Sequence, residues 1–296
     1  MTRTLSVIGA PSSAGAYAPG QERAPGVFRQ HGLIEALGRT GRIVHDRGDV
    51  DGFRWRPDPP RPKAMNLDAV CRTAAAVADK VAAVIENNEA ALVLGGDCTV
   101  ELGTIAGALR VRPSVGLIYI DLDVDLNPPE AGDGALDWTG VAHVLDLAGT
   151  QPSLSGLAGR RPMLQASEIL FFGPDAITDG EARTIEALNL SVLELAVVKA
   201  DPAGAATRAA KWADRFDCVL VHLDVDVLAF TDFPIAENTR RRAGLTLEEL
   251  WASLSILCAT TNWRALTISE VNPDHAPDEA AAFRRLNAML VDCLAS

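Results

Sequence analysis

A series of short apolar runs that do not alternate with polar residues constrains the fold of this chain most. The runs are rich in β-branched residues, and they are Leu5–Ile8, Arg42–Val44, Ala91–Leu94, Val115–Ile120, Ile169–Phe172, Val219–Leu223 and Ala265–Ile268. Strands with both faces buried have this pattern, which is typical of a parallel sheet covered by helices. We therefore interpret each run as a buried strand.

Ala- and Leu-rich stretches of helical character lie between these runs. They are Leu67–Asn87, Val100–Leu109, Gly180–Ala187, Ala203–Phe216, Thr246–Thr260 and Asp278–Leu294. Strands that alternate with helices form βαβ units. The pattern predicts an α/β fold, a three-layer α/β/α sandwich with a mainly parallel sheet. The Pro-rich segment Arg54–Lys63 interrupts it only briefly, so we expect one domain over residues 1–296.

The charge and cysteine content exclude several classes of function. The formal net charge is −12 and the pI is near 4.9, whereas nucleic acids and anionic membranes attract clustered Lys and Arg. The five cysteines are scattered, odd in number and without a CxxC pair, which argues against a disulfide framework. The first apolar run is too short for a signal peptide or a membrane span. These features predict a cytoplasmic protein whose partner is a small molecule.

Carboxylates cluster where two of the predicted strands end. Asp121, Asp123 and Asp125 follow one apolar run, and Asp224 and Asp226 follow another. Side chains two residues apart share a face if the extended conformation continues, and carboxylates crowded in this way repel unless cations or protons intervene. Either cluster alone would fit turn capping. Two clusters at one edge of a parallel sheet favour a site for divalent metal ions, for which Mn²⁺ or Mg²⁺ is the best match.

Two further strand ends carry candidate residues. Gly95 and Gly96 precede Asp97 and Cys98, and Glu270 follows the last predicted strand. Each also has a simpler interpretation, Cys98 as a small buried apolar residue and Glu270 as an ion-pair partner. His222 follows an apolar run, and we interpret it as a packed or hydrogen-bonding histidine.

The motifs taken together resemble the ureohydrolase family, which includes arginase, agmatinase and formiminoglutamase. Gly95–Cys98 resembles the family's GGDH, Asp121–Asn127 its DAHxDxN, Thr139–His143 its SGxxHG, and Asp224–Asp226 the centre of its SxDxDxxDP. The opening segments Val7–Pro11 and Ala24–Arg29, Asp232 with Pro234, Gly244–Thr246 and Glu270–Pro273 also resemble family segments, in the family's order. The resemblance covers nearly the whole chain and implies an arginase-like fold.

The resemblance also implies a reaction and a set of site residues. In that family two Mn²⁺ ions activate a water molecule that attacks a guanidinium carbon and releases urea or an analogue. Carried over by position, the metal ligands are Cys98, Asp121, Asp123, Asp125, Asp224 and Asp226, with Asp121 and Asp224 as the bridging pair. The catalytic residues are His143, Glu270 and Asp125, where His143 handles protons and Glu270 pairs with the substrate guanidinium. The substrate-binding residues are Asn127, Thr139 and Thr178. A homo-oligomer, a trimer or a hexamer, is expected on the same basis.

The departures from the family pattern concern the metal and the substrate. The two histidines that the family supplies as metal ligands are Cys98 and Asp123 here. Six anionic ligands would exceed the charge of two divalent ions and weaken water activation. Three arrangements would relieve this excess: Asp123 protonated or turned away, Cys98 kept as a thiol, or a different metal such as iron.

The substrate end also differs from the family. Val141 stands where amino-acid-specific members have an asparagine, and Thr178 where an aspartate receives an α-ammonium group. A cysteine at the position of Cys98 also resembles a branch that acts on N-hydroxyarginine. We therefore expect hydrolysis of a guanidino or amidino C–N bond in a modified arginine or another guanidino compound. The alternative is a non-catalytic arginase-like regulatory or scaffold protein.

Overall fold

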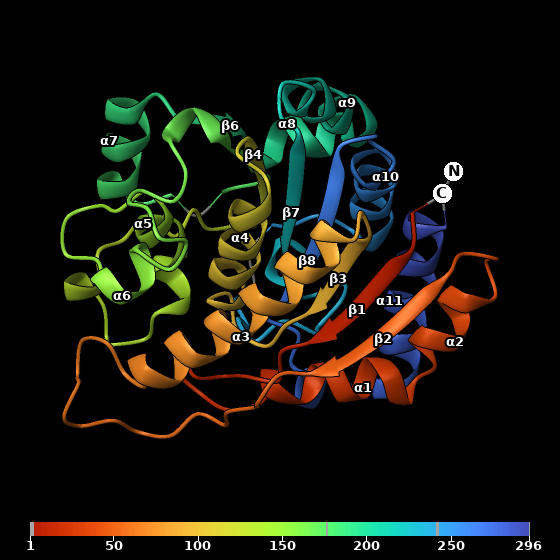
Figure 1. Ribbon diagram of the computed structural model, residues 1–296, viewed down its shortest axis with the longest axis horizontal. Helices are drawn as coiled ribbons and strands as arrows, with labels where there is room; N and C mark the ends of the chain where they lie inside the picture. The colour runs from red at the N-terminus through yellow and green to blue at the C-terminus, as the bar shows by residue number, and fades with distance from the viewer. Residues whose placement is uncertain (1–2, 176, 241–242, 296) are drawn as a thin grey trace.

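Eight strands form one sheet in which every pair of neighbours runs parallel (Figure 1). The computed structural model describes residues 3–175, 177–240 and 243–295. The strand order is β2-β1-β3-β8-β7-β4-β5-β6. The strands are β1 Leu5–Gly9, β2 Val44–Asp49, β3 Ala90–Leu94, β4 Val115–Ile120, β5 Ile169–Phe172, β6 Ser191–Leu193, β7 Cys218–Asp224 and β8 Trp263–Ser269.

Helices cover both faces of the sheet and complete the three predicted layers. The helices are α1 Ala24–Gln30, α2 Leu33–Gly38, α3 Leu67–Glu86, α4 Val100–Val111, α5 Gly140–Val144, α6 Pro152–Ser155, α7 Asp179–Leu188, α8 Leu195–Ala200, α9 Pro202–Ala213, α10 Leu247–Cys258 and α11 Glu279–Leu294. The core on one face is built by α3 and α4, which Figure 1 shows in front of the sheet. The core on the other face is built by α1, α2, α9, α10 and α11. The predicted α/β/α fold is confirmed.

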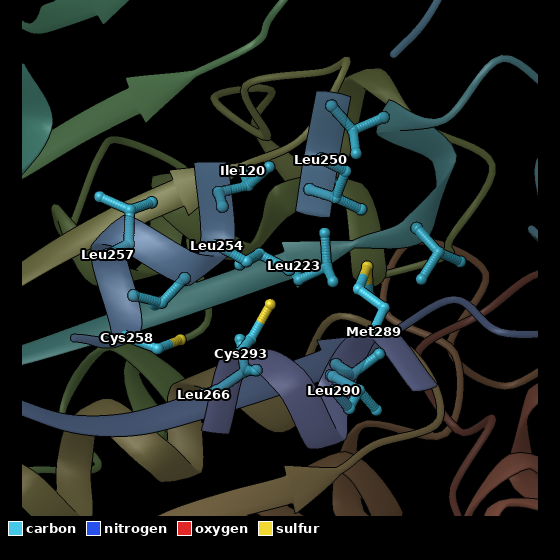
Figure 2. Close-up of a cluster of buried hydrophobic side chains, with 14 of the residues drawn as sticks. Ile120, Leu223, Leu250, Leu254, Leu257, Cys258, Leu266, Met289, Leu290 and Cys293 are labelled. Carbon is cyan, nitrogen blue, oxygen red and sulfur yellow. The ribbon is translucent and has the colours of Figure 1, made fainter. Parts of the chain in front are cut away.

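The second of these cores shows why the central strands read as continuous apolar runs. In Figure 2, leucines of α10 and the Met289, Leu290 and Cys293 side chains of α11 pack against one face of the sheet. Ile120, Leu223 and Leu266 supply that face from β4, β7 and β8. Residues of the same strands that point to the other face, such as Leu117, Leu220 and Ala265, belong to the opposite core, so apolar residues occupy most positions.

The two edges of the sheet are where the predicted strands are wrong. The run at Arg42–Val44 is followed by the observed strand β2 at Val44–Asp49, whose residues are mostly exposed and polar. Strand β6 was not predicted, and it has three residues. An edge strand has a neighbour on one side and solvent on the other, so it does not need an apolar run.

Two further findings concern the chain as a whole. None of the helices in the described residues combines the length and apolarity needed to cross a membrane. All five cysteines are free.

Candidate metal centre

The carboxyl ends of four adjacent strands, β3, β8, β7 and β4, meet at one cavity of about 380 Å³. Asp224 is the last residue of β7, and the loops after β3, β8 and β4 carry the candidate residues Cys98, Glu270 and Asp121. The remaining lining residues include Tyr17, Asp123, Asp125, Asn127, Asp133, Asp137, Trp138, Thr178, Glu181, Asp226, Asn238 and Arg240. Ligands of open parallel sheets bind at this end of the strands. The structure therefore brings together the strand-end residues that the sequence singled out.

A close backbone approach places Cys98 in the cavity. A Cβ atom added to Gly96 would lie 1.9 Å from the carbonyl oxygen of Ser12, so a larger residue would push these two loops apart. The Cys98 backbone N–H donates to Glu270 Oε1 at 2.9 Å, and Gln21 Nε2 donates to Glu270 Oε2 at 2.7 Å. Both oxygens of Glu270 are thereby oriented, with the residue itself buried.

The loop after β4 corrects the expectation that Asp121, Asp123 and Asp125 share one face. The strand ends at Ile120, and Asp121 Oδ1 then accepts a hydrogen bond from the Asp123 backbone N–H at 2.7 Å. This turn directs Asp123 away from Asp121 and toward the guanidinium of Arg240, with which it forms an ion pair. Asp123 is thus paired with a cation at the edge of the cavity, but it stays close enough for its charge, after burial, to raise the pKa of Asp226.

Asp125 and Glu270 both have a left-handed backbone, with φ of 50° and 64°. Residues with a side chain seldom adopt this region, and such conformations cluster at functional sites. Asp125 is further held by Tyr119, whose hydroxyl donates to Oδ2 at 2.5 Å.

The second carboxylate pair lies at the end of β7. Asp224 Oδ1 accepts the Asp226 backbone N–H at 2.7 Å, and the Cys98 thiol donates to Asp224 Oδ2 at 3.2 Å. Asp226 Oδ2 accepts from Asn238 Nδ2 at 2.8 Å. The pair therefore faces the cavity from a short and well-bonded turn.

Burial and mutual repulsion dominate the electrostatics of these groups. Burial raises the pKa of Asp121 well above the ordinary value, and the nearby Asp224 and Asp226 add to the effect. Burial and Asp226 likewise raise the pKa of Asp224. Burial, followed by Asp224 and Glu270, raises the pKa of the Cys98 thiol. Such a cluster retains protons unless cations neutralise it.

The donor atoms fit divalent metal ions. Carboxylate oxygens of Asp121, Asp224 and Asp226 lie within 4.8 Å of one another, and so do ligand atoms of Cys98, Asp121 and His222. Asp121 belongs to both groups. The first group is all oxygen, which suits Mn²⁺ or Mg²⁺, while the second adds sulfur and nitrogen.

Two of the three predicted substrate-binding residues lie at the cavity. Asn127 Nδ2 donates to Glu181 Oε1 at 2.7 Å, and the Thr178 hydroxyl donates to Glu181 Oε2 at 2.8 Å. Thr178 caps the N-terminus of α7, and the buried Glu181 joins it to Asn127. Thr139 is fully buried instead, and its hydroxyl donates to the carbonyl oxygen of Leu136 at 2.7 Å.

His143 also lies outside the described lining of the cavity. It is fully buried, with Nδ1 2.8 Å from the carbonyl oxygen of Thr139, and Nε2 accepts the Gln151 backbone N–H at 3.0 Å. Burial lowers its pKa. With both ring nitrogens bonded to the backbone, His143 cannot exchange protons with a ligand in the cavity unless this arrangement breaks.

Sequence reasoning did not assign to the site several residues that line the cavity or contact its lining. Tyr119 and His222 lie inside apolar strands, and Asn238 and Arg240 lie in a loop with no motif. His222 offered one signal, because it stands two residues before Asp224 and so shares the alternation of the carboxylate pair. Nothing in the sequence marked Arg240, since its partner Asp123 is 117 residues away.

Comparisons of the sequence and of the structure with known proteins point to the same family. A sequence profile of the arginase family matches residues 3–294. The chain is 30% identical to human arginase-1 over 99% of this chain and 92% of that protein. It is 29% identical to the arginase of Bacillus subtilis over 93% of each chain. A crystal structure of a Bacillus subtilis arginase superposes with a TM-score of 0.88 at 25% identity, covering 99% of this chain and 98% of that one. The formimidoylglutamase of Bacillus subtilis, at 17% identity and a TM-score of 0.76, shares the fold over 99% of this chain and 87% of that one.

Proposed function

Because this chain belongs to the arginase family, we propose that it is a metal-dependent hydrolase of a guanidino or amidino C–N bond. One observation carries the proposal: Asp121, Asp125, Asp224 and Asp226 converge, buried, on a single cavity. Buried carboxylates at this density are costly unless cations neutralise them. Two divalent ions, Mn²⁺ by family resemblance, would be held by these aspartates and supply the Lewis acidity that makes water nucleophilic near neutral pH.

The chain's own residues orient the substrate. Glu270 presents a carboxylate whose two oxygens are fixed by the Cys98 backbone and Gln21, which suits it to hold a cationic amidine. Asp133 and Asp137 add negative charge to the lining and favour a cationic ligand. Asp125, fixed by the Tyr119 hydroxyl, takes the proton of the attacking water at its carboxylate.

The preferred substrate is a modified guanidine rather than free arginine. Thr178 presents a hydroxyl where an aspartate would attract an α-ammonium group, and that hydroxyl is engaged with Glu181. Thr139 and Val141 point into the core and offer no polar group to the cavity. N-Hydroxyarginine is the first candidate, on the resemblance of Cys98 to the branch that acts on it. A cytoplasmic location and assembly into a homo-oligomer, a trimer or a hexamer, are part of the same proposal.

Metal analysis with a substrate panel tests the proposal. Purified protein should retain or take up about two Mn²⁺ per chain and release urea from a guanidine or hydroxyurea from N-hydroxyarginine. The variant Glu270→Gln should keep its metal and lose at least about tenfold in kcat/KM, because the substrate cation loses its partner. The matched control Glu248→Gln changes an exposed glutamate of α10 and should behave as wild type.

A different result would support the non-catalytic alternative. If the protein retains no metal, and added Mn²⁺ neither binds nor raises the melting temperature, then the proposed reaction is wrong. Metal binding without turnover of any guanidino or amidino compound would also contradict it.

A further inference from the structure

A polar layer lies beneath the cavity, on the side of the sheet covered by α4. Tyr119 of β4 pairs in register with His222 of β7, and His222 pairs with Thr267 of β8. The Thr267 hydroxyl is 2.9 Å from that of Thr104 on α4. The three side chains therefore point toward α4, away from the leucine-rich core of Figure 2.

His222 reaches from this layer to the candidate ligands. Its Nε2 is 3.4 Å from the Cys98 Sγ, and the ligand atoms of Cys98, Asp121 and His222 all lie within 4.8 Å of one another. Its ring stacks on that of Tyr119 with centroids 4.2 Å apart and planes 12° from parallel. The residue is fully buried, so the ring orientation is fixed by packing.

The other ring nitrogen faces a second buried group that lacks a partner. Glu101 of α4 is 3% exposed, and its Oε2 is 3.6 Å from His222 Nδ1. Within the described part of the chain, neither oxygen of Glu101 nor His222 Nδ1 has a hydrogen-bond partner. A small approach would join them, which places the ring proton on Nδ1 and leaves the Nε2 lone pair facing Cys98 and Asp121.

This arrangement matches the usual environment of a metal-bound histidine, which donates its second N–H to a carboxylate. We propose that His222 is a metal ligand of this site beside Cys98 and Asp121, and that Glu101 is the positioning residue that fixes its tautomer. The inference rests on the proposed metal centre and adds a ligand to it. The imidazole that the family supplies at the position of Cys98 would then come from β7, which β8 separates from β3 in the sheet.

The donor set also implies a metal preference. Sulfur and imidazole favour Zn²⁺, Fe²⁺ or Co²⁺ over Mn²⁺, whereas the group Asp121, Asp224 and Asp226 offers only oxygen. The side of the site that contains Cys98 and His222 should therefore bind Co²⁺ more tightly than Mn²⁺.

Titration of the metal-free protein with Co²⁺ tests the inference without reference to activity. In wild type, Co²⁺ should give visible ligand-field bands together with a near-ultraviolet thiolate charge-transfer band. The variant His222→Asn keeps an amide near Nδ1 and removes Nε2, so Co²⁺ affinity should fall by about 100-fold or more and the visible bands should change. The control His31→Asn removes a histidine that contacts Glu279 and should leave the titration unchanged.

The proposed role of Glu101 is tested by Co²⁺ affinity, a quantity that a purely structural role would leave unchanged. Glu101→Ala should weaken Co²⁺ binding by about tenfold or more, and Glu101→Gln, which keeps an acceptor oxygen, should lose less. Without metal, neither variant should have a lower melting temperature than wild type, because each removes a buried carboxylate that has no partner among the described residues. A lower melting temperature with unchanged Co²⁺ affinity would show that Glu101 is merely structural.

The outcomes separate this inference from the proposed function. If wild type binds neither Co²⁺ nor Mn²⁺, both are wrong. If wild type binds metal and His222→Asn binds it equally with the same spectrum, the inference alone is wrong. Should the variants fail to fold, the proton NMR spectrum of Co²⁺-loaded wild type decides. It should contain a strongly shifted, exchangeable imidazole N–H signal, and its absence would overturn the proposal.

Discussion

The two positions where the family has histidine ligands have different surroundings in this protein. Cys98 lies in a closed region, where it contacts His222 and Asp224 and is 3% exposed. Asp123 lies at the half-exposed rim, where Arg240 neutralises it. On the Cys98 side we propose that an imidazole from β7 takes the place of the missing one, and on the Asp123 side a guanidinium takes up the charge. On this proposal one half of the metal site, at Cys98 and His222, is rebuilt, and the other half, at Asp123, is reduced.

Changing the residue that joins the two halves should have the largest effect. Asp121 belongs to both groups of candidate ligands, so Asp121→Asn should lower the affinity for Mn²⁺ and Co²⁺ together by more than about 100-fold and abolish turnover. Isothermal titration with each metal measures this. Asp217→Asn, an exposed aspartate beside the start of β7, is the matched control. Loss of only one metal would mean that Asp121 does not connect the two halves.

Single substitutions at Cys98 and at Asp123 should lower metal affinity to different extents. Cys98→Ser should weaken Co²⁺ binding by about tenfold or more, because the side with sulfur and nitrogen ligands loses its thiolate. Asp123→Asn should change metal affinity by less than about threefold, since the carboxylate is already paired with Arg240. Equal losses in the two variants would remove the distinction between a rebuilt and a reduced half.

The stabilisation that Mn²⁺ gives should depend on pH, because the buried aspartates hold protons when no metal is bound. Burial raises the pKa of Asp121, Asp125 and Asp224, so the metal-free folded protein holds protons that the unfolded chain releases. That stabilisation is complete below the ordinary pKa of 3.8 and is lost as the pH rises through the raised values. Metal must displace these protons, so the rise in melting temperature caused by Mn²⁺ should grow from mildly acidic to mildly alkaline buffer. A rise that stays constant or shrinks with pH would contradict this assignment.

Removing the cation at the rim should have the smallest effect. Arg240→Gln frees Asp123 and removes a positive charge 4.0 Å from Asp226, so the affinity for Mn²⁺ should increase by about threefold at low ionic strength. The increase should disappear in high salt, because the side chain is 45% exposed and the interaction is screened. Arg208→Gln, at an exposed position on α9, serves as the control. A decrease in affinity would mean that Arg240 supports the site rather than competing with metal.

The sequence predicted the central part of the fold better than its edges. The bounds of β4 and β5 agree with the predicted runs, because strands buried on both faces allow only apolar residues. β2 and β6 are edge strands, so burial leaves a weaker pattern in their sequences. The α/β/α sandwich could therefore be predicted even though two of its strands were misplaced or missed.

The candidate site was predictable where its residues follow strands, and less so where contacts join distant segments. Asp121, Asp224 and Glu270 follow directly from strand ends at one edge of the sheet. The turn that diverts Asp123, and the contact with Arg240, depend on local hydrogen bonds and a distant loop. His222 was interpreted as a packed histidine, because the sequence does not show that its face of β7 meets Glu101. The prediction for His143 came from a motif, and the structure places that residue in a different environment.

The left-handed backbone of Asp125 and Glu270 has a consequence for laboratory evolution. At each position glycine would relieve about 1 kcal/mol of backbone strain and would also remove a buried acid. A selection that rewards only heat resistance would therefore favour variants that lose these carboxylates. Libraries of variants therefore need a simultaneous screen for metal binding or turnover. At either position, a single substitution can raise stability and destroy the site at once.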